Sequence, residues 1–149
     1  MAHGLVRLKV RADFLRVAAG RRRAVRPGVM LQAAPCPAGT AGGELVRVGF
    51  TASRKVGNAV IRNRAKRRLR AAAAEVLARA GRPGTDYVLV ARAGTGERTY
   101  PELVGDLETA LRQIARQGER QMYRQADPTG DRGGGEPRSG RVAEGGDDR

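Results

Sequence analysis

A run of positive charge between residues 54 and 70 constrains this chain more than any other feature. It contains eight Lys or Arg residues in 17 positions and no Asp or Glu. The run overlaps a helical pattern over 58–80. The apolar positions of that pattern form one narrow stripe: Ile61, Ala65, Leu69, Ala72, Val76 and Ala80. Because like charges one turn apart repel, such a helix needs its stripe packed on a core and its cations placed against a polyanion.

Capping residues mark the beginning of two long helices. Asn58 is a favourable N-cap, because its side-chain oxygen accepts a hydrogen bond from the first helical turn. A second helix is expected over 99–117, where Thr99 and Glu102 fit a capping box. Its predicted buried face consists of Leu103, Leu107, Ala110, Leu111 and Ile114.

Three strands are expected between and before these helices. Residues 46–52 alternate apolar side chains with charged or small ones, which is typical of a strand with one buried face. Residues 29–34 follow a Pro-Gly break. Residues 87–91 form a continuous apolar run, which indicates a central strand buried on both faces.

The first residues are interpreted as a short basic segment followed by a helix that Gly20 ends. Its spacing places Phe14, Val17 and Ala18 on one face. The three arginines at 21–23 are interpreted as a solvated loop. Together these patterns predict an α/β fold, an α+β two-layer sandwich whose small sheet is covered by helices mainly on one face.

The distribution of charge separates a basic domain from a tail. The chain carries 29 basic and 15 acidic residues, a formal net charge of +14. Residues 126–149 contain six acidic and four basic residues and seven Gly, so nearly all the large apolar side chains lie before them. We expect one folded domain over 1–124 and a disordered tail over 125–149. So basic a domain is expected to bind nucleic acid, and less readily an anionic membrane surface.

Several classes of protein are excluded by what the chain lacks. Cys36 is the one cysteine and His3 the one histidine, which excludes a disulfide framework, a multi-cysteine zinc site and a His-ligated metal cluster. The acidic residues are scattered along the sequence, so we expect no catalytic or metal-binding residue of a two-metal nuclease. No apolar run approaches the ~20 residues of a membrane span. Without a secretory signal pattern, a cytoplasmic protein is expected.

The content of aromatic and arginine residues indicates how nucleic acid is recognised. Two Phe and three Tyr are too few for a sheet that stacks bases, which favours recognition of the backbone and shape of structured RNA or DNA. Arg outnumbers Lys by 26 to 3. The guanidinium group binds phosphate through two parallel hydrogen bonds, which suits this mode.

The order of residues within 47–70 resembles the signature of the protein subunit of bacterial ribonuclease P. Its most specific parts are Gly57-Asn58-Ala59-Val60, the Arg-Asn-Arg sequence at 62–64, and the Lys-Arg pair at 66–67. A generic basic helix would not carry these elements in this register. The resemblance covers about residues 5–120.

This resemblance implies an activity and its partners. The family's enzyme is an endoribonuclease that removes the 5′ leader of precursor tRNA by hydrolysis. Its RNA subunit is catalytic and holds the Mg²⁺ ions, and the protein is an essential helper. The implied partners are therefore the catalytic RNA and precursor tRNA, with no DNA and no membrane. The implied fold is a mixed sheet with a left-handed βαβ crossover, an exception to the usual hand.

The resemblance also implies roles for individual residues. The matched motif packs against the catalytic RNA, the arginines after it extend that surface, and the turn before the helix leads into it. The implied RNA-binding residues are Ser53, Arg54, Lys55, Asn58, Arg62, Asn63, Arg64, Lys66, Arg67, Arg68 and Arg70.

In this family a cleft between the first helix and the sheet binds the single-stranded leader. Phe14 matches an aromatic residue of that cleft, although its spacing alone is that of a core residue. Val17 and Gln32 are assigned to the same cleft. Family members often carry further aromatic residues where this chain has Ala18 and near Gln32. These departures predict a weaker preference for the leader.

Two alternatives share the charge but not the activity. A structural RNA-binding protein of the ribosomal type would need no cleavage partner. A DNA-binding regulator with a helix-turn-helix would place two helices side by side in the sequence. Here the basic helix lies between two strand patterns, which does not favour the regulator.

Overall fold

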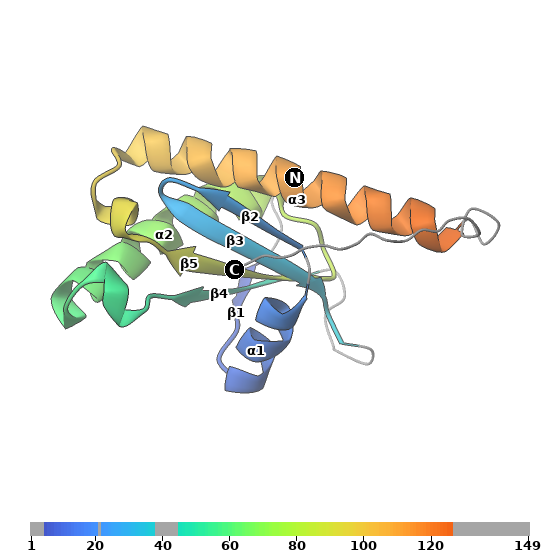
Figure 1. The fold of residues 1–149 in the computed structure, drawn as a ribbon, viewed down its shortest axis with the longest axis horizontal. Coiled ribbons are helices and arrows are strands. Elements are labelled where there is room, and N and C mark those ends of the chain that lie inside the picture. Colours follow the sequence, from blue (N-terminus) through green and yellow to red (C-terminus); the bar gives the residue numbers. More distant parts are fainter. Residues whose placement is uncertain (1–4, 21, 38–44, 127–149) are drawn as a thin grey trace, which may run out of the picture. The chain divides into compact units, whose positions relative to one another are not determined.

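The computed structural model describes residues 5–20, 22–37 and 45–126 (Figure 1). The chain divides into two compact units, Met1–Ala115 and Arg116–Arg149. The described part of the second unit is the C-terminal portion of one helix. Of the tail predicted over 125–149, residues 125–126 belong to this helix and 127–149 lie outside the described residues, and the predicted domain boundary stays a prediction.

The first unit is built on a five-stranded mixed sheet in the order β1-β4-β5-β3-β2. The two parallel pairs are β1 with β4 and β4 with β5, and the two antiparallel pairs are β3 with β5 and β2 with β3. The strands are β1 (Leu5–Arg7), β2 (Arg22–Arg26), β3 (Val29–Pro35), β4 (Val46–Thr51) and β5 (Thr85–Ala91). The continuous apolar run forms the central strand β5, as the sequence predicted.

Three α-helices accompany the sheet: α1 (Arg11–Ala19), α2 (Ala59–Ala80) and α3 (Tyr100–Ala126), with short 3-10 turns η1 (Arg54–Val56) and η2 (Ala93–Gly96). The predicted caps are confirmed. Asn58 Oδ1 accepts a hydrogen bond from the backbone N–H of Ile61 at 3.0 Å. The backbone N–H groups of Thr99 and Glu102 donate to each other's side chains at 2.9 and 3.3 Å.

The two faces of the sheet are covered unequally. The larger core lies between the sheet and the helices α2 and α3, where Leu69, Leu77, Leu103 and Leu107 are fully buried. The opposite face carries α1 over a small cluster formed by Leu8, Val17, Ala34 and Val88. Two of the three helices therefore share one face, as expected. The inner residues of the predicted α2 stripe are buried, whereas Ile61 and Ala80 at its ends are exposed.

The connection from β4 to β5 has an unusual hand. The strands are parallel and hydrogen-bonded to each other, and α2 connects them. In Figure 1 both strands point to the left, β5 lies above β4, and α2 passes behind the sheet. This is a left-handed crossover, the hand that the resemblance implied.

The sequence analysis did not predict the two edge strands. Arg22 and Arg23 were interpreted as part of a loop, but they belong to β2 and pair with Ala33 and Gln32 of β3. An edge strand needs few apolar positions, and in β2 only Ala24 is buried. The three residues of β1 are too few to show a periodic pattern.

Candidate nucleic-acid interface

The eight Lys and Arg residues between 54 and 70 are here called the cationic cluster. None of them forms an ion pair with a carboxylate of the described residues. The first acid in α2 is Glu75, beyond the end of the cluster. Unpaired cations at this density create a positive potential that favours a polyanion.

The helical repeat arranges these side chains in rows along α2. Positions four apart lie on one face, so Arg62, Lys66 and Arg70 form one row, which is half-buried along its length. On the outer face Arg64 and Arg67 are exposed, and Asn63 is exposed beside them. The Arg-Asn-Arg motif is therefore divided between the two, with Arg62 in the half-buried row and Asn63 and Arg64 on the outer face.

Two of the predicted RNA-binding arginines also contact the fold. Arg68 donates a hydrogen bond to the backbone carbonyl of Arg98 in the segment before α3. The Arg70 guanidinium carbon lies 6.0 Å from the ring centroid of Phe50, within cation–π range. The Nε atoms of Arg62, Arg68 and Arg70 are buried and have no partner among the described residues. In each of these three arginines the protein therefore covers the end of the aliphatic chain, where Nε is attached.

The turn before α2 exposes its polar residues. Ser53, Arg54 and Lys55 are exposed at η1. Asn58 is exposed as well, but its side chain is occupied by the cap. The structure thus brings all the predicted RNA-binding residues to one segment, η1 and the N-terminal half of α2.

A groove of about 560 Å³ lies on the α1 face of the sheet. Phe14, Leu15 and Ala18 of α1 line it, and the strands contribute Gln32 and Val90 among others. Of the predicted cleft residues, the structure brings Phe14 and Gln32 to this groove but not Val17. The Val17 side chain has no exposed surface and packs beneath α1 in the small core.

Gly49 leaves room for the Phe14 ring to approach the sheet closely. A Cβ on this glycine would come within 2.5 Å of the Phe14 ring. The ring is half-buried and also lines the groove. The core interpretation and the cleft interpretation of Phe14 therefore both describe part of its environment.

A second recess of about 420 Å³ connects the groove with η1. Met30 and Val90 line both hollows, and Ser53, Lys55 and Arg92 line the second. The groove itself is lined by two further cations, Lys9 and Arg11. Sequence reasoning missed Lys9, Arg11 and Arg92, because only the folded sheet places them around the same surface.

A buried carboxylate holds α1 onto the sheet. Asp86 of β5 has no exposed surface and accepts two hydrogen bonds from Arg47 of β4, at 2.7 and 2.8 Å. Arg16 of α1 pairs with the same carboxylate, and the Cys36 thiol donates to it at 3.0 Å. Asp13 of α1 lies 3.2 Å from Arg16 and 3.4 Å from Arg47. We call these five residues the Asp86 cluster.

The Asp86 cluster fixes the protonation of its members. Burial alone would raise the pKa of Asp86, but hydrogen bonds from Arg47, Cys36 and Arg16 outweigh it and lower that pKa below its usual value. Burial and the neighbouring carboxylate raise the pKa of the Cys36 thiol to about 11. At neutral pH the carboxylate is therefore charged and the thiol is protonated, which describes a structural joint rather than a nucleophile.

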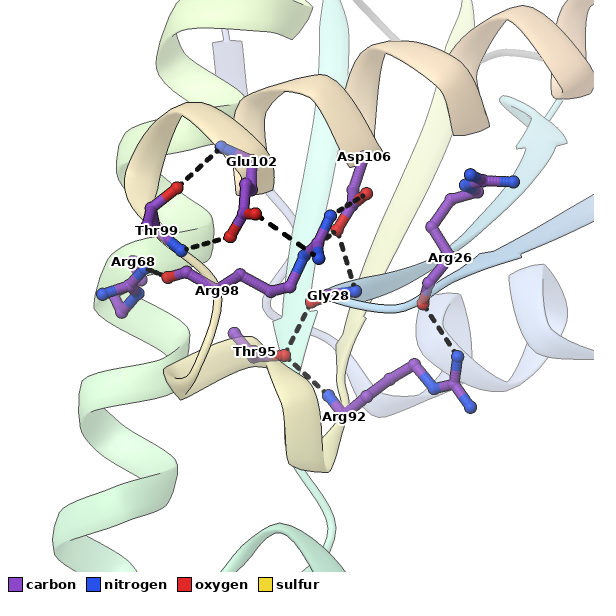
Figure 2. A network of polar contacts seen from close by, with 9 residues as sticks. All are labelled: Arg26, Gly28, Arg68, Arg92, Thr95, Arg98, Thr99, Glu102 and Asp106. Carbon is purple, nitrogen blue, oxygen red and sulfur yellow. Dashed lines mark hydrogen bonds and ion pairs between the residues drawn. The ribbon is translucent and has the colours of Figure 1, made fainter.

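A second polar network ties the start of α3 to the sheet and to α2 (Figure 2). Arg98 donates to both oxygens of Asp106, at 2.9 and 3.0 Å, and Asp106 also accepts the backbone N–H of Gly28 at 3.0 Å. The buried Thr95 hydroxyl donates to the Gly28 carbonyl at 2.7 Å. Because Arg68 binds the Arg98 carbonyl, this network also supports the basic helix.

The described residues contain no group of three or more His, Cys, Asp or Glu side chains that is suited to hold a metal ion. Nor is any helix within the described part long and apolar enough to cross a membrane. A cationic cluster with no ion pair to an acid of the described residues, next to a groove on an α+β sandwich, indicates a nucleic-acid-binding protein.

Comparison with known proteins specifies this class further. The family model for ribonuclease P matches residues 3–115. The ribonuclease P protein component of Paramagnetospirillum magneticum is 53% identical over 114 residues, which cover 76% of this chain and 86% of the relative. That of Ruegeria pomeroyi is 52% identical over 112 residues, which cover 74% and 87%.

Solved structures agree with the sequence comparison. The RNase P protein of Staphylococcus aureus superposes with a TM-score of 0.56 at 26% identity, over 71% of this chain and 92% of that chain. The protein of Thermotoga maritima gives a TM-score of 0.56 at 24% identity, over 68% and 90%, and shows the fold alone.

The chain belongs to the ribonuclease P protein family. Its function is that of the protein component of ribonuclease P, an accessory subunit of a ribonucleoprotein endoribonuclease that processes tRNA. The resemblance carried by residues 47–70 is thereby confirmed.

Proposed function

We propose that the cationic cluster binds the catalytic RNA and that the groove beside α1 receives the 5′ leader of precursor tRNA. The observation that carries this proposal is that the cationic cluster, which has no acidic partner within the described part of the chain, begins beside the recess that Ser53 and Lys55 line next to the groove. One continuous surface can therefore contact both RNAs. Binding of this kind weakens steeply with salt, because it releases counterions.

The two parts of the surface suit different features of RNA. Exposed guanidinium groups of Arg64 and Arg67 suit phosphates of a folded RNA, and Asn63 adds a side chain that both donates and accepts hydrogen bonds. Two aromatic residues line the groove, Phe14 from α1 and Phe50 from β4, and Gln32 of β3 also lines it. One stacked base with phosphates near Lys9 and Arg11 is the contact that this lining supports.

The groove carries few groups that recognise a base. Ala18 lines it where family members often have an aromatic residue, and Gln32 occupies the corresponding place on β3. We therefore propose that the leader is bound mainly through its backbone, with a modest contribution from stacking. A modest preference for precursor over mature tRNA follows.

We further propose that the Mg²⁺ ions of the reaction are held mainly by the RNA subunit. Asp13 of α1 and Asp86 of β5, two elements that line the groove, are engaged by Arg16 and Arg47 and do not fit a metal site. The contribution of the protein is then to screen repulsion between the two RNAs, so that less Mg²⁺ is needed. The cytoplasmic location expected from the sequence stays a prediction.

Cleavage of precursor tRNA at low Mg²⁺ tests this proposal. We expect accurate removal of the leader with protein and cognate catalytic RNA together, and little with either alone. Replacing Arg62 and Arg64 by Gln should remove the stimulation, whereas Arg112→Gln on α3, outside the surface, should not. Cleavage by the protein alone would contradict the accessory role. Tight RNA binding without stimulation would instead indicate a structural RNA-binding protein.

A further inference from the structure

The first turn of α2 carries an exposed aliphatic pair inside the cationic cluster. Val60 is 74% exposed and Ile61 is 47% exposed, and Val60 is the most exposed large hydrophobic residue of the described part. Single aliphatic residues on a protein surface are ordinary. Two adjacent ones at the tip of a helix whose outer face is otherwise cationic indicate a contact with a partner.

The geometry of the helix places this pair among the proposed RNA contacts. Residues three and four positions apart in a helix are neighbours on its surface. Val60 therefore lies beside Asn63 and Arg64, and Ile61 also lies beside Arg64. Arg64 is exposed and has no acidic partner among the described residues. A partner that contacts Arg64 must therefore also cover the aliphatic pair.

The turn before the helix holds Ile61 in place. Gly57 has a φ of 152°, and a Cβ there would lie 2.9 Å from Ile61 Cγ2, so the Ile61 side chain rests directly on the glycine. The backbone N–H of Ile61 is bound by Asn58. Ile61 is thus held in place before a partner arrives, which reduces the entropy lost on binding.

We propose that Val60 and Ile61 form an apolar contact for an unpaired nucleobase of the catalytic RNA, while the surrounding cations bind the phosphates on either side. An unstacked base offers an apolar face whatever its sequence. The surrounding charge favours RNA over a second copy of this chain, because two cationic clusters repel each other. The inference rests on the proposed RNA-binding role of α2 and names the apolar part of that contact.

Affinity for the catalytic RNA, measured over a series of KCl concentrations, tests the proposal. The variant Val60→Ala/Ile61→Ala removes aliphatic surface and keeps good helix formers. We expect roughly tenfold weaker binding at every salt concentration, with the slope against salt unchanged, because the lost contact is not ionic. Val25→Ala on β2, a residue 49% exposed, is the matched control and should bind like the wild type. Val60→Leu should retain wild-type affinity.

A second readout identifies the base itself. In base-specific chemical probing of the complex, a base protected by the wild-type protein should become reactive with the double alanine variant and stay protected with Val25→Ala. Unchanged affinity and unchanged probing would overturn the inference while leaving the proposed function intact. A reduced salt slope would also overturn it, since the variant would then act by displacing cations. Self-association of the free protein through this pair would assign it to a protein interface instead.

Failure of the proposed function gives a different result. A wild-type protein that binds the catalytic RNA without any dependence on salt would contradict the phosphate contacts of the cationic cluster. That outcome would remove the basis of the inference as well. Arg62→Gln/Arg64→Gln, measured in parallel, separates the two cases because only ionic contacts change the slope.

Discussion

The Asp86 cluster and the cationic cluster use the same residue type in opposite ways. In the first, Arg16 and Arg47 pair with a carboxylate that has no exposed surface. In the second, eight cations follow one another without a single acidic partner among the described residues. Neither cluster could take the place of the other, because the paired arginines are already neutralised and the unpaired ones repel each other.

The arginines of the Asp86 cluster stabilise the fold, whereas the residues of the cationic cluster remain available to bind a partner. The buried acids of the first unit, Asp86 and Asp106, each engage an arginine that joins two elements: α1 to β5, or the segment before α3 to α3 itself. Acids are absent from the stretch where RNA is proposed to bind. Removing a charge from the Asp86 cluster should therefore lower stability, whereas removing a charge from the cationic cluster should lower RNA affinity.

Removing the buried carboxylate should have the largest effect. Asp86→Ala leaves Arg16 and Arg47 without their partner, and breaking a buried pair in this way costs about 3 kcal/mol of unfolding free energy. Urea unfolding measures the loss. Glu97→Ala, at an exposed position with no ion pair to another described residue, is the control and should change stability little. A loss below about 1 kcal/mol would mean that the Asp86 cluster does not hold α1.

Removing unpaired cations should change binding and leave stability intact. Arg62→Gln/Arg64→Gln relieves repulsion along α2, so the unfolding free energy should stay the same or rise. Affinity for the catalytic RNA should fall by tenfold or more, and the slope of log affinity against log salt should become shallower by about 2. Fluorescence titrations over a salt series measure both. If stability fell as much as with Asp86→Ala, the comparison between the clusters would be wrong.

Lowering the pH should weaken the Asp86 cluster and leave the charge of the cationic cluster unchanged. The folded-state pKa of Asp86 lies below its unfolded value, so the stability from this carboxylate is complete above the unfolded pKa. It is lost as the pH falls through the folded pKa. Arginines keep their charge throughout this range. Urea midpoints should therefore fall below about pH 4 in the wild type and much less in Asp86→Asn, a variant that cannot titrate there.

The sequence predicted the elements whose patterns are local. The helices α2 and α3 and the strand β4 repeat apolar residues at a fixed period, β5 is a continuous apolar run, and β3 follows a Pro-Gly break. The strands β1 and β2 escaped prediction because an edge strand carries few buried residues. The hand of the crossover came from the resemblance and not from any pattern. The Asp86 cluster joins Asp13 to Asp86 across 73 positions of sequence, so no local pattern indicates it.

The site was predicted to a different extent in its two parts. The RNA-binding residues of η1 and α2 are contiguous, so a motif located them together. The groove is assembled from α1 and three strands, and only Phe14 and Gln32 of its predicted residues line it. Val17 shares the helical face of Phe14 in the sequence pattern, yet a small rotation around the helix places it in the core. A helical face predicted from spacing alone is too coarse to separate a groove from the core beside it.

The smallest effect should come from Phe14, the aromatic residue that α1 contributes to the groove, and it sharpens the contrast with the cationic cluster. Phe14→Ala should weaken binding of precursor tRNA by the holoenzyme about fivefold, near the lower limit for one stacked base, and leave mature tRNA binding unchanged. The slope against salt should not change, because no phosphate contact is lost. Leu15→Ala, on the same helix and groove wall, controls for a general loss of apolar surface. Equal weakening of precursor and mature tRNA binding would mean that the leader binds elsewhere. A large loss of affinity confined to precursor tRNA would show that Phe14 compensates for the missing aromatic residues.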